Sequence, residues 1–261
     1  MSKFDAVIFD WAGTLIDFGS FAPMGAFVEA FAHFGVSVSI ADARGPMGAP
    51  KRDHIRAMIA LPHVAEGWRA AQGAAPDEAA IDRIYEVFVP MNEEVVARYA
   101  TLVPGAADTL AWLSAQGIRM GTTTGYVRSI MARVLPVVAE QGFQPEVCIC
   151  ADDVPKGRPG PWQMYRVFAD MTLLPGPQIV KVDDTPPGIS EGRATGCTVV
   201  GVALSGNIAG RTPEELAALS EAERDTIRAQ AGAELRAAGA DHVIDSIADL
   251  PALLTRLDAE G

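Results

Sequence analysis

The sequence contains little cysteine, and its few cysteines lack the pattern of a disulfide framework or a metal site. Cys148, Cys150 and Cys197 are the three cysteines among 261 residues. Their number is odd, and the chain begins without the basic and apolar segments of an export signal. Cys148 and Cys150 lie two residues apart in an apolar run, and no further cysteine or histidine ligand lies near them in the sequence. We therefore expect three buried free thiols.

Positive charge is also scarce. The chain has 21 lysines and arginines against 33 aspartates and glutamates, a net charge of −12. Nucleic acids and anionic membranes would be repelled on average, so an anionic substrate must be captured by local positive charge. No apolar run approaches the ~20 residues needed to span a bilayer. We expect a soluble, cytoplasmic protein with a small-molecule substrate and with neither a nucleic acid nor a membrane as partner.

Short apolar runs alternate with helical patterns along the chain, and hydrophobic residues make up 49% of it, enough for a full core. Because the runs lack the in-out alternation of a half-exposed sheet, they predict parallel strands covered by helices on both faces. The predicted class is an α/β fold with a doubly wound parallel sheet. The runs lie at residues 6–10, 118–125, 146–150, 178–184, 197–204 and 242–245.

The long segment between the first two apolar runs has no strand signal. It contains helical patterns at 23–35, 50–61 and 77–96. A gap of this length is too long for an ordinary connection between strands. We predict a second, all-helical domain at 21–98, inserted into an α/β core domain of residues 1–20 and 99–261. Near the end, the alanine-rich amphipathic segment 212–240 predicts helices that pack on the surface.

Four predicted strands are followed by residues that suit phosphoryl transfer. They supply a carboxylate (Asp10), a hydroxyl and glycine pair (Thr124, Gly125), a cation (Arg158) and further acids (Asp183, Asp184). Ligands of open parallel sheets bind beyond the carboxyl ends of the strands. Each residue alone has a simpler explanation, such as a helix cap, strand propensity or a solvated arginine. The ordered set favours a nucleophile, a phosphate site and metal ligands.

The order of these motifs resembles the haloacid dehalogenase superfamily and, within it, the phosphonoacetaldehyde hydrolase family. The resemblance covers nearly the whole chain through "FDWAGT", "FAP", "PMG" with Lys51 three residues on, "DH" at Asp53 and His54, "TTGY", "DDVPKGRPGPW" and "EGRATG". It implies a Rossmann-like core with a helical cap domain. It also implies a Mg²⁺-dependent enzyme that cleaves phosphonoacetaldehyde into acetaldehyde and phosphate.

Residue 12 gives this resemblance a chemical reason. Phosphatases of the superfamily carry there an Asp that protonates the departing alkoxide, whereas this chain has Ala12. A C–P bond has no leaving oxygen, so the electrons need another acceptor, which a lysine Schiff base supplies. Lys51 is the candidate, because we expect its helix start and neighbouring Arg52 to lower its pKa. His54, one turn along, would relay protons; the alternative for Lys51 is an ordinary solvated lysine.

The resemblance also implies roles for the remaining site residues. Asp10 is the nucleophile, and Mg²⁺ is held by Asp10, Asp184 and the backbone carbonyl of Ala12. A homodimer would form through the cap helices, with "AFVEAFAHF" as the aromatic contact face. The phosphonate and the pocket between cap and core would be contacted by Met47, Gly48, Thr124, Gly125, Tyr126 and Arg158. Simple packing is the alternative for Met47 and Tyr126, and His33, His63 and His242 are taken as structural.

One departure concerns the loop after the fourth strand. The family has a Gly-Asp pair and a further Asp four residues later, whereas this chain has Asp183 in the glycine position and Gly188 in that of the later Asp. The lost carboxylate would orient a metal ligand or a metal-bound water. Two alternatives therefore stay open: another hydrolase of the superfamily (a phosphatase or dehalogenase), or a non-catalytic binding protein of this fold.

Overall fold

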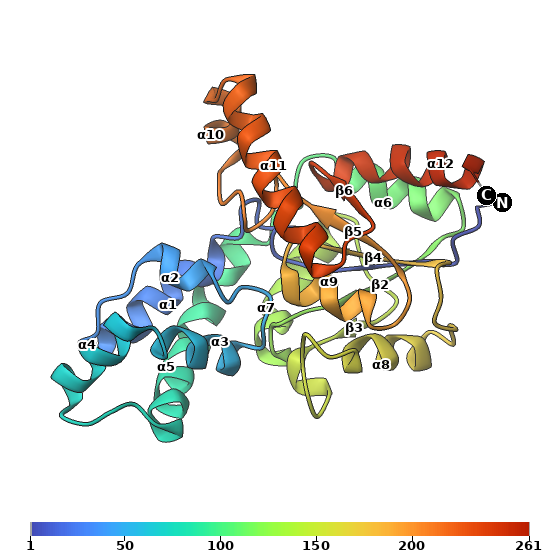
Figure 1. Ribbon diagram of the computed structural model, residues 1–261. Coiled ribbons are helices and arrows are strands. Elements are labelled where there is room, and N and C mark those ends of the chain that lie inside the picture. Colours follow the sequence, from blue (N-terminus) through green and yellow to red (C-terminus); the bar gives the residue numbers. More distant parts are fainter. Residues whose placement is uncertain (1, 261) are drawn as a thin grey trace.

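The computed structural model describes residues 2–260 and has two parts (Figure 1). One part is a sheet flanked by helices, and the other is a group of helices inserted after the first strand. The chain ends lie close together, on the far side of the sheet from the inserted helices. The strands are β1 (Ala6–Phe9), β2 (Arg119–Thr123), β3 (Cys148–Ile149), β4 (Ile179–Asp183), β5 (Thr198–Val202) and β6 (His242–Ile244).

All strand pairings in the sheet are parallel, in the order β3-β2-β1-β4-β5-β6. The predicted doubly wound parallel sheet is confirmed. Phe9 in β1 is in register with Thr122 in β2 and with Val182 in β4. The residues that follow these strands are therefore brought to one edge of the sheet. The strand order reverses beside β1, where ligands of such sheets bind.

Helices cover both faces of the sheet because consecutive strand residues point to opposite sides. Val7 and Phe9 pack with α6 and α7, whereas Ala6 and Ile8 pack with α8. The helices of this part are α6 (Ala106–Ala115), α7 (Arg128–Glu140), α8 (Trp162–Asp170), α9 (Pro186–Arg193), α10 (Pro213–Ala218), α11 (Glu221–Ala238) and α12 (Leu250–Glu260), with 3-10 turns η2 (Ala151–Asp153) and η3 (Ile247–Asp249).

The inserted helices have a hydrophobic core of their own. It is built on Phe27, Phe31, Trp68 and Phe88 and is separate from the clusters around the sheet. The elements are α1 (Ala22–His33), α2 (Ile40–Arg44), α3 (Lys51–Ile59), α4 (Pro62–Gln72) and α5 (Glu78–Val96), followed by the 3-10 turn η1 (Ala97–Tyr99). The exact boundaries at residues 21 and 98 stay a prediction.

The proposed contact face of a homodimer needs a correction. Phe27 and Phe31 of "AFVEAFAHF" are fully buried within the inserted helices, and Phe27 stacks on Phe88 of α5 with ring centroids 4.1 Å apart. They are buried because α1 and α5 pack along one another, so these rings are not available to a second chain. The homodimer itself stays a prediction.

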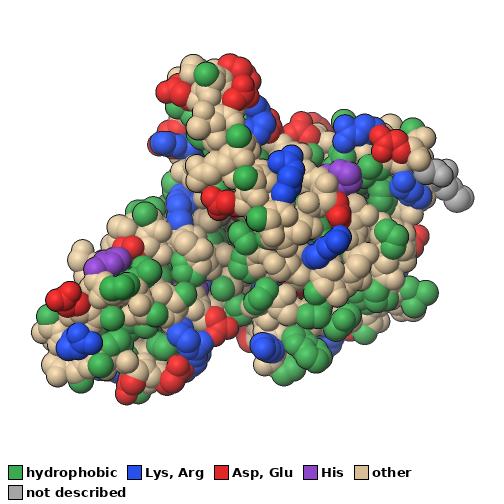
Figure 2. All heavy atoms as spheres, viewed as in Figure 1, with side chains coloured by type: hydrophobic (Ala, Val, Ile, Leu, Met, Phe, Trp, Pro, Cys, Tyr) green, Lys and Arg blue, Asp and Glu red, His purple; other side chains and the backbone are tan. Residues whose placement is uncertain are grey.

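The alanine-rich segment forms α10 and α11, and the pair projects from the body of the molecule (Figure 1). Ser220 and Glu223 form a capping box at the start of α11, and Gly239 ends it in a left-handed conformation. The buried residues of α11 lie in its second half, so that half alone packs on the sheet. On the face that Figure 2 presents, lysines and arginines are interspersed with acids. Within residues 2–260, no helix combines the length and hydropathy of a membrane span.

Candidate active site

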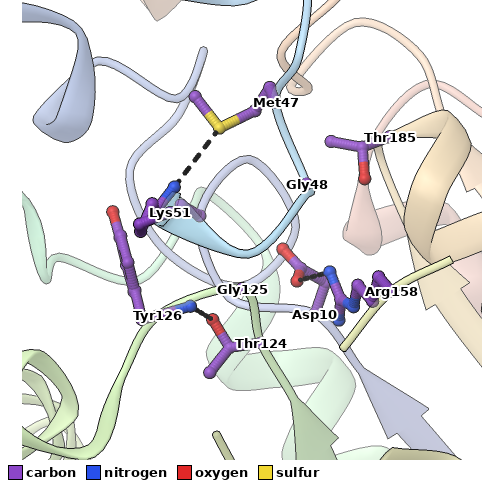
Figure 3. Close-up of a pocket in the computed structure, with 10 residues that line it drawn as sticks. Asp10, Met47, Gly48, Lys51, Thr124, Gly125, Tyr126, Arg158 and Thr185 are labelled. Carbon is purple, nitrogen blue, oxygen red and sulfur yellow. Dashed lines mark hydrogen bonds and ion pairs between the residues drawn. The ribbon is translucent and has the colours of Figure 1, made fainter. Parts of the chain in front are cut away.

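The predicted site residues converge on one pocket between the inserted helices and the sheet (Figure 3). Its cavity has a volume of about 20 Å³, room for about one water molecule. Of the predicted residues, His54 and Asp184 are not in its wall, and Thr185 was not predicted. The wall is made of Asp10, Ala12, Met47, Gly48, Lys51, Thr124, Gly125, Tyr126, Arg158 and Thr185.

Asp10, directly after β1, is buried at the base of this pocket. Arg158 donates a hydrogen bond from Nη1 to its Oδ1 at 2.7 Å. Burial and the nearby charge of Asp183 raise the pKa of Asp10 to about 6, while Arg158 and Lys181 act to lower it. The carboxylate is thus paired with a cation but shielded from water. A buried anion of this kind can act as a nucleophile toward a phosphorus atom.

Arg158 is held from several sides beneath the pocket. Its Nη2 donates to Thr123 Oγ1 at 2.7 Å and its Nε to Glu191 Oε2 at 3.1 Å. Lys181 Nζ donates to the same threonine oxygen at 2.9 Å and lies 3.0 Å from Asp183 Oδ2. Fixing the guanidinium in this way gives a preorganised positive charge in the pocket wall, beside Asp10.

The sequence pattern predicts no role for Lys181 or Glu191. Both are fully buried, and both contact the groups that hold Arg158. In the sequence, Lys181 stands between two valines of a predicted strand. A lysine at such a position is expected to be buried, and a buried charge requires a partner. Glu191 lies in the "EGRATG" motif but carried no predicted role.

Three carboxylates form a group that could hold a metal ion. Asp10, Asp183 and Asp184 each place an oxygen within 4.8 Å of the others. With Glu191, four buried carboxylates lie near two buried cations, Arg158 and Lys181, an excess of two negative charges. Burial and the charges of Asp10 and Asp183 raise the pKa of Asp184 well above its usual value. A divalent cation would relieve this repulsion, so the residues fit a metal of the Mg²⁺ type.

Asp184 approaches the backbone of the loop after β1. A Cβ on Gly13 would lie 2.1 Å from Asp184 Oδ2, and φ is +89° at this glycine. Thr14 Oγ1 donates to Asp184 Oδ1 at 3.2 Å, and the backbone N–H of Asn207 donates to Oδ2 at 2.7 Å. The carboxylate is therefore oriented beside Gly13, the residue after Ala12, whose carbonyl is the third predicted ligand.

The presence of Asp183 and Gly188, where the resemblance led us to expect Gly and Asp, has a geometric explanation. A Cβ on Gly188 would lie 1.9 Å from Asp183 Oδ2, so the carboxylate of residue 183 occupies the space that a side chain at 188 would need. Burial acts to raise the pKa of Asp183, but Lys181 and Arg158 outweigh it and hold the pKa below its usual value. Asp183 therefore supplies a negative charge in this region from a different position in the sequence.

Lys51, the first residue of α3, reaches the pocket from the side opposite Asp10 (Figure 3). Its ammonium lies 4.8 Å from the ring centroid of Tyr126, 5.6 Å from that of Phe27 and 3.9 Å from Met47 Sδ. Burial lowers its pKa to about 8, and Arg158 contributes, while the negative charges of Asp10 and Asp17 oppose the shift. The neutral amine is therefore accessible near physiological pH.

The prediction that Arg52 helps to lower the pKa of Lys51 was wrong. Its side chain turns away from the pocket to Glu78 and Asp82, at 2.8 and 2.6 Å, and it is not among the groups that lower the pKa of Lys51. Salt bridges to exposed acids hold it at the surface. The main cause is removal of the lysine from water.

His54 lies one turn along α3 from Lys51 and outside the pocket wall. Its Nε2 is 2.7 Å from the carbonyl of Ala43, and its ring stacks on Phe27 with centroids 4.0 Å apart. Its Nδ1 has no hydrogen-bond partner among residues 2–260. Burial and the charge of Lys51 lower its pKa well below the usual value, so the imidazole is neutral. The proton relay through His54 stays a prediction.

Glycines allow the inserted helices to approach the sheet closely. A Cβ on Gly48 would lie 2.2 Å from Thr185 Oγ1, and one on Gly157 would lie 2.4 Å from Pro50 Cγ. A Cβ on Gly125 would lie 2.8 Å from the carbonyl of Ala49. The loop before α3 therefore rests on the loops of the sheet, and this contact closes the pocket above Asp10.

Known proteins share this sequence and architecture. The haloacid dehalogenase-like hydrolase family matches residues 4–196. Phosphonoacetaldehyde hydrolase of Paraburkholderia phytofirmans is 49% identical over 99% of this chain and 97% of its own, and that of Salmonella typhi is 43% identical over 99% and 97%.

Solved structures agree. A phosphonoacetaldehyde hydrolase-like protein from Oleispira antarctica is 41% identical with a TM-score of 0.96, covering 99% of this chain and 94% of its own. A hydrolase from Pseudomonas syringae, 17% identical with a TM-score of 0.71 over 97% of this chain and 99% of its own, shares the fold.

Proposed function

Because the chain belongs to the haloacid dehalogenase-like hydrolases and, within them, to the phosphonoacetaldehyde hydrolases, we propose that it cleaves the carbon–phosphorus bond of phosphonoacetaldehyde. The products are acetaldehyde and phosphate. The observation that carries the proposal is a lysine with a lowered pKa in the same pocket as a buried aspartate, with alanine at residue 12. An oxygen-ester phosphatase would need an acid at that residue, and it would have no use for Lys51.

The first step takes place at Lys51. Its neutral amine adds to the aldehyde carbon, and the resulting carbinolamine takes up one proton from solvent and loses water to give a protonated imine. The surrounding rings of Phe27 and Tyr126 exclude solvent from this group. The positive nitrogen then lies two bonds from the carbon that carries phosphorus, so it can accept the electron pair of the C–P bond.

The second step takes place at Asp10. Its carboxylate oxygen attacks phosphorus while the C–P bond breaks, and the electron pair moves into an enamine on Lys51. Arg158 and the Thr124–Gly125 turn hold the phosphonate oxygens in place. Protonation of the enamine carbon gives a new iminium, and water releases acetaldehyde from Lys51. A second water releases phosphate from Asp10.

A divalent cation, which we propose is Mg²⁺, would be held by Asp10, Asp184 and the carbonyl of Ala12. When bound, it supplies charge neutralisation of the phosphoryl oxygens. Asp183, held by Lys181 and Arg158, borders the same group of carboxylates. Residue 12 therefore contributes through its backbone, which explains why its side chain can be lost.

Trapping with borohydride tests this proposal. Reduction in the presence of phosphonoacetaldehyde should fix a two-carbon adduct on Lys51, located by peptide mass spectrometry. Lys51→Arg serves as the control, because arginine keeps the charge but forms no imine. Absence of the adduct from the unmodified enzyme would instead favour a phosphatase or a dehalogenase.

A further inference from the structure

Arg44, the last residue of α2, extends out of the inserted helices toward the sheet. Its Nη1 donates to the carbonyl of Gly19 at 2.7 Å and to the backbone and side-chain oxygens of Asn207, both at 3.2 Å. Its Cζ lies 4.9 Å from the ring centroid of Phe21. Arg56 of α3, by contrast, bonds only to Asp53 and Glu78 within the same helices. Arg44 thus joins the inserted helices to the core.

Asn207 connects this contact to the carboxylate group. Its Nδ2 donates back to the carbonyl of Arg44 at 3.3 Å. Its backbone N–H donates to Asp184 Oδ2 at 2.7 Å. The residue is buried, so neither bond is readily replaced by water. A single residue therefore touches both the inserted helices and the expected metal ligand.

Arg44 also contacts the strand-to-helix crossover, residues 17–21, where the chain enters the inserted helices. Asp17, Gly19 and Ser20 all have positive φ there, of 54°, 82° and 57°. Asp17 accepts hydrogen bonds from the N–H groups of Phe21 and Ala22 at the start of α1. Gly19 donates to Ser205 in the loop that also carries Asn207. The bonds of Arg44 thus fix the crossover against that loop.

We propose that Arg44 and Asn207 are positioning residues that couple closure of the inserted helices to the orientation of Asp184. The proposal rests on the proposed function in one respect, namely that Asp184 binds a divalent cation. The pocket of about 20 Å³ has room for about one water molecule, so the inserted helices have to move for a substrate to enter, and the contact between Arg44 and Asn207 lies between the parts that move. Coupling is reciprocal, so closure strengthens cation binding and a bound cation favours closure.

Mg²⁺ affinity, measured by isothermal titration of the whole chain without substrate, tests the coupling. Arg44→Met keeps an unbranched stem over Phe21 but removes all three hydrogen bonds. It should weaken Mg²⁺ binding about 5-fold or more. The matched control Arg56→Met also removes a guanidinium from the inserted helices, and it should change the affinity less than about 2-fold.

Hydrogen exchange of the crossover amides provides the second measurement. Mg²⁺ should slow this exchange in the unmodified chain and in Arg56→Met, and it should have little effect in Arg44→Met. If Arg44→Met does not fold, Asn207→Ala tests the same coupling, because it removes the side-chain bonds and keeps the N–H to Asp184. Unchanged affinity together with a retained Mg²⁺ effect would overturn the proposal, as would failure of the unmodified chain to bind Mg²⁺. These measurements use no substrate, so their outcome does not depend on whether borohydride traps an adduct on Lys51.

Discussion

The two sides of the pocket hold their charged groups in opposite ways. On the sheet side, Asp10, Asp183 and Glu191 lie in direct contact with Arg158 or Lys181. On the side of the inserted helices, Lys51 lies among aromatic rings and a methionine sulfur. Pairing with cations favours the charged form of the first group and opposes the effect of burial, whereas Lys51 is buried without a carboxylate in contact, which disfavours its charge.

This difference matches the two kinds of chemistry proposed for the site. The sheet side has to hold anions near one another, and it uses cations to do so. The inserted helices have to provide a neutral amine, and they achieve this by excluding water. Burial raises the pKa of Asp10 to about 6 and lowers that of Lys51 to about 8. One physical cause thus moves an acid and a base in opposite directions.

Removing one reactive group from each side should give the largest effects. Lys51→Arg and Asp10→Asn should each reduce phosphate release by several orders of magnitude, since each removes an atom that forms a covalent bond. The two variants should differ in trapping. Asp10→Asn should still give the borohydride adduct on Lys51, and Lys51→Arg should give none while binding phosphonate almost as tightly as the unmodified enzyme. Substantial turnover by Lys51→Arg would mean that the lysine acts only through its positive charge and forms no imine.

Exchanging Asp183 and Gly188 tests the paired charges of the sheet side. Asp183→Gly should destabilise the fold by about 3 kcal/mol, because Lys181 loses a buried partner. Gly188→Asp alone should cost about 1–3 kcal/mol through its clash with Asp183. The loss in free energy of unfolding of the double variant, measured by urea unfolding, should be about 1–3 kcal/mol smaller than the sum of the losses of the two single variants.

Gly25→Asp is the control for this exchange, since it adds the same side chain to a helix glycine with open space around it. It should change the free energy of unfolding by less than about 0.5 kcal/mol. Additive effects of Asp183→Gly and Gly188→Asp would show that residues 183 and 188 do not compete for one volume.

The pH dependence of trapping gives the smallest and most graded effect. With the pKa of Lys51 lowered from 10.5 to about 8, its neutral fraction should rise about tenfold per pH unit up to pH 8 and level off above it. The rate of adduct formation on Lys51, measured at fixed aldehyde concentration between pH 6 and 9.5 at ~0.5-unit steps, should follow this curve. A rate that still rises tenfold per unit above pH 9 would mean that burial does not shift this lysine.

The sequence was most informative where secondary structure alone brings residues together. Parallel strands place the residues after them at one edge, so the neighbourhood of Asp10, Thr124 and Asp184 could be predicted. The lowered pKa of Lys51 was also predicted, but its cause was assigned to the helix start and to Arg52, whereas the largest cause is burial. Burial depends on which rings fold over the amine, and a linear pattern does not contain that information.

The residues that were missed act through contacts between distant segments. Glu191 pairs with Arg158 across 33 positions of the chain, Lys181 bonds to Thr123 across 58, and Arg44 bonds to Asn207 across 163. No local spacing distinguishes such residues from solvated ones. Hydrogen-bond partners and burial, which require the folded chain, identify them.

The glycine contacts above the pocket also bear on the energy of motion. At Gly48, Gly125 and Gly157, one partner in each contact between the inserted helices and the sheet is a glycine without a side chain; the other partner is Thr185, the carbonyl of Ala49 or the ring of Pro50. Separation at these contacts transfers little hydrocarbon surface into water, and each Å² of such surface costs roughly 25 cal/mol. The free energy needed to part the two surfaces there is therefore small. Contacts that leave no room for a side chain at these glycines make the closed pocket tight and, at the same points, require little free energy to open.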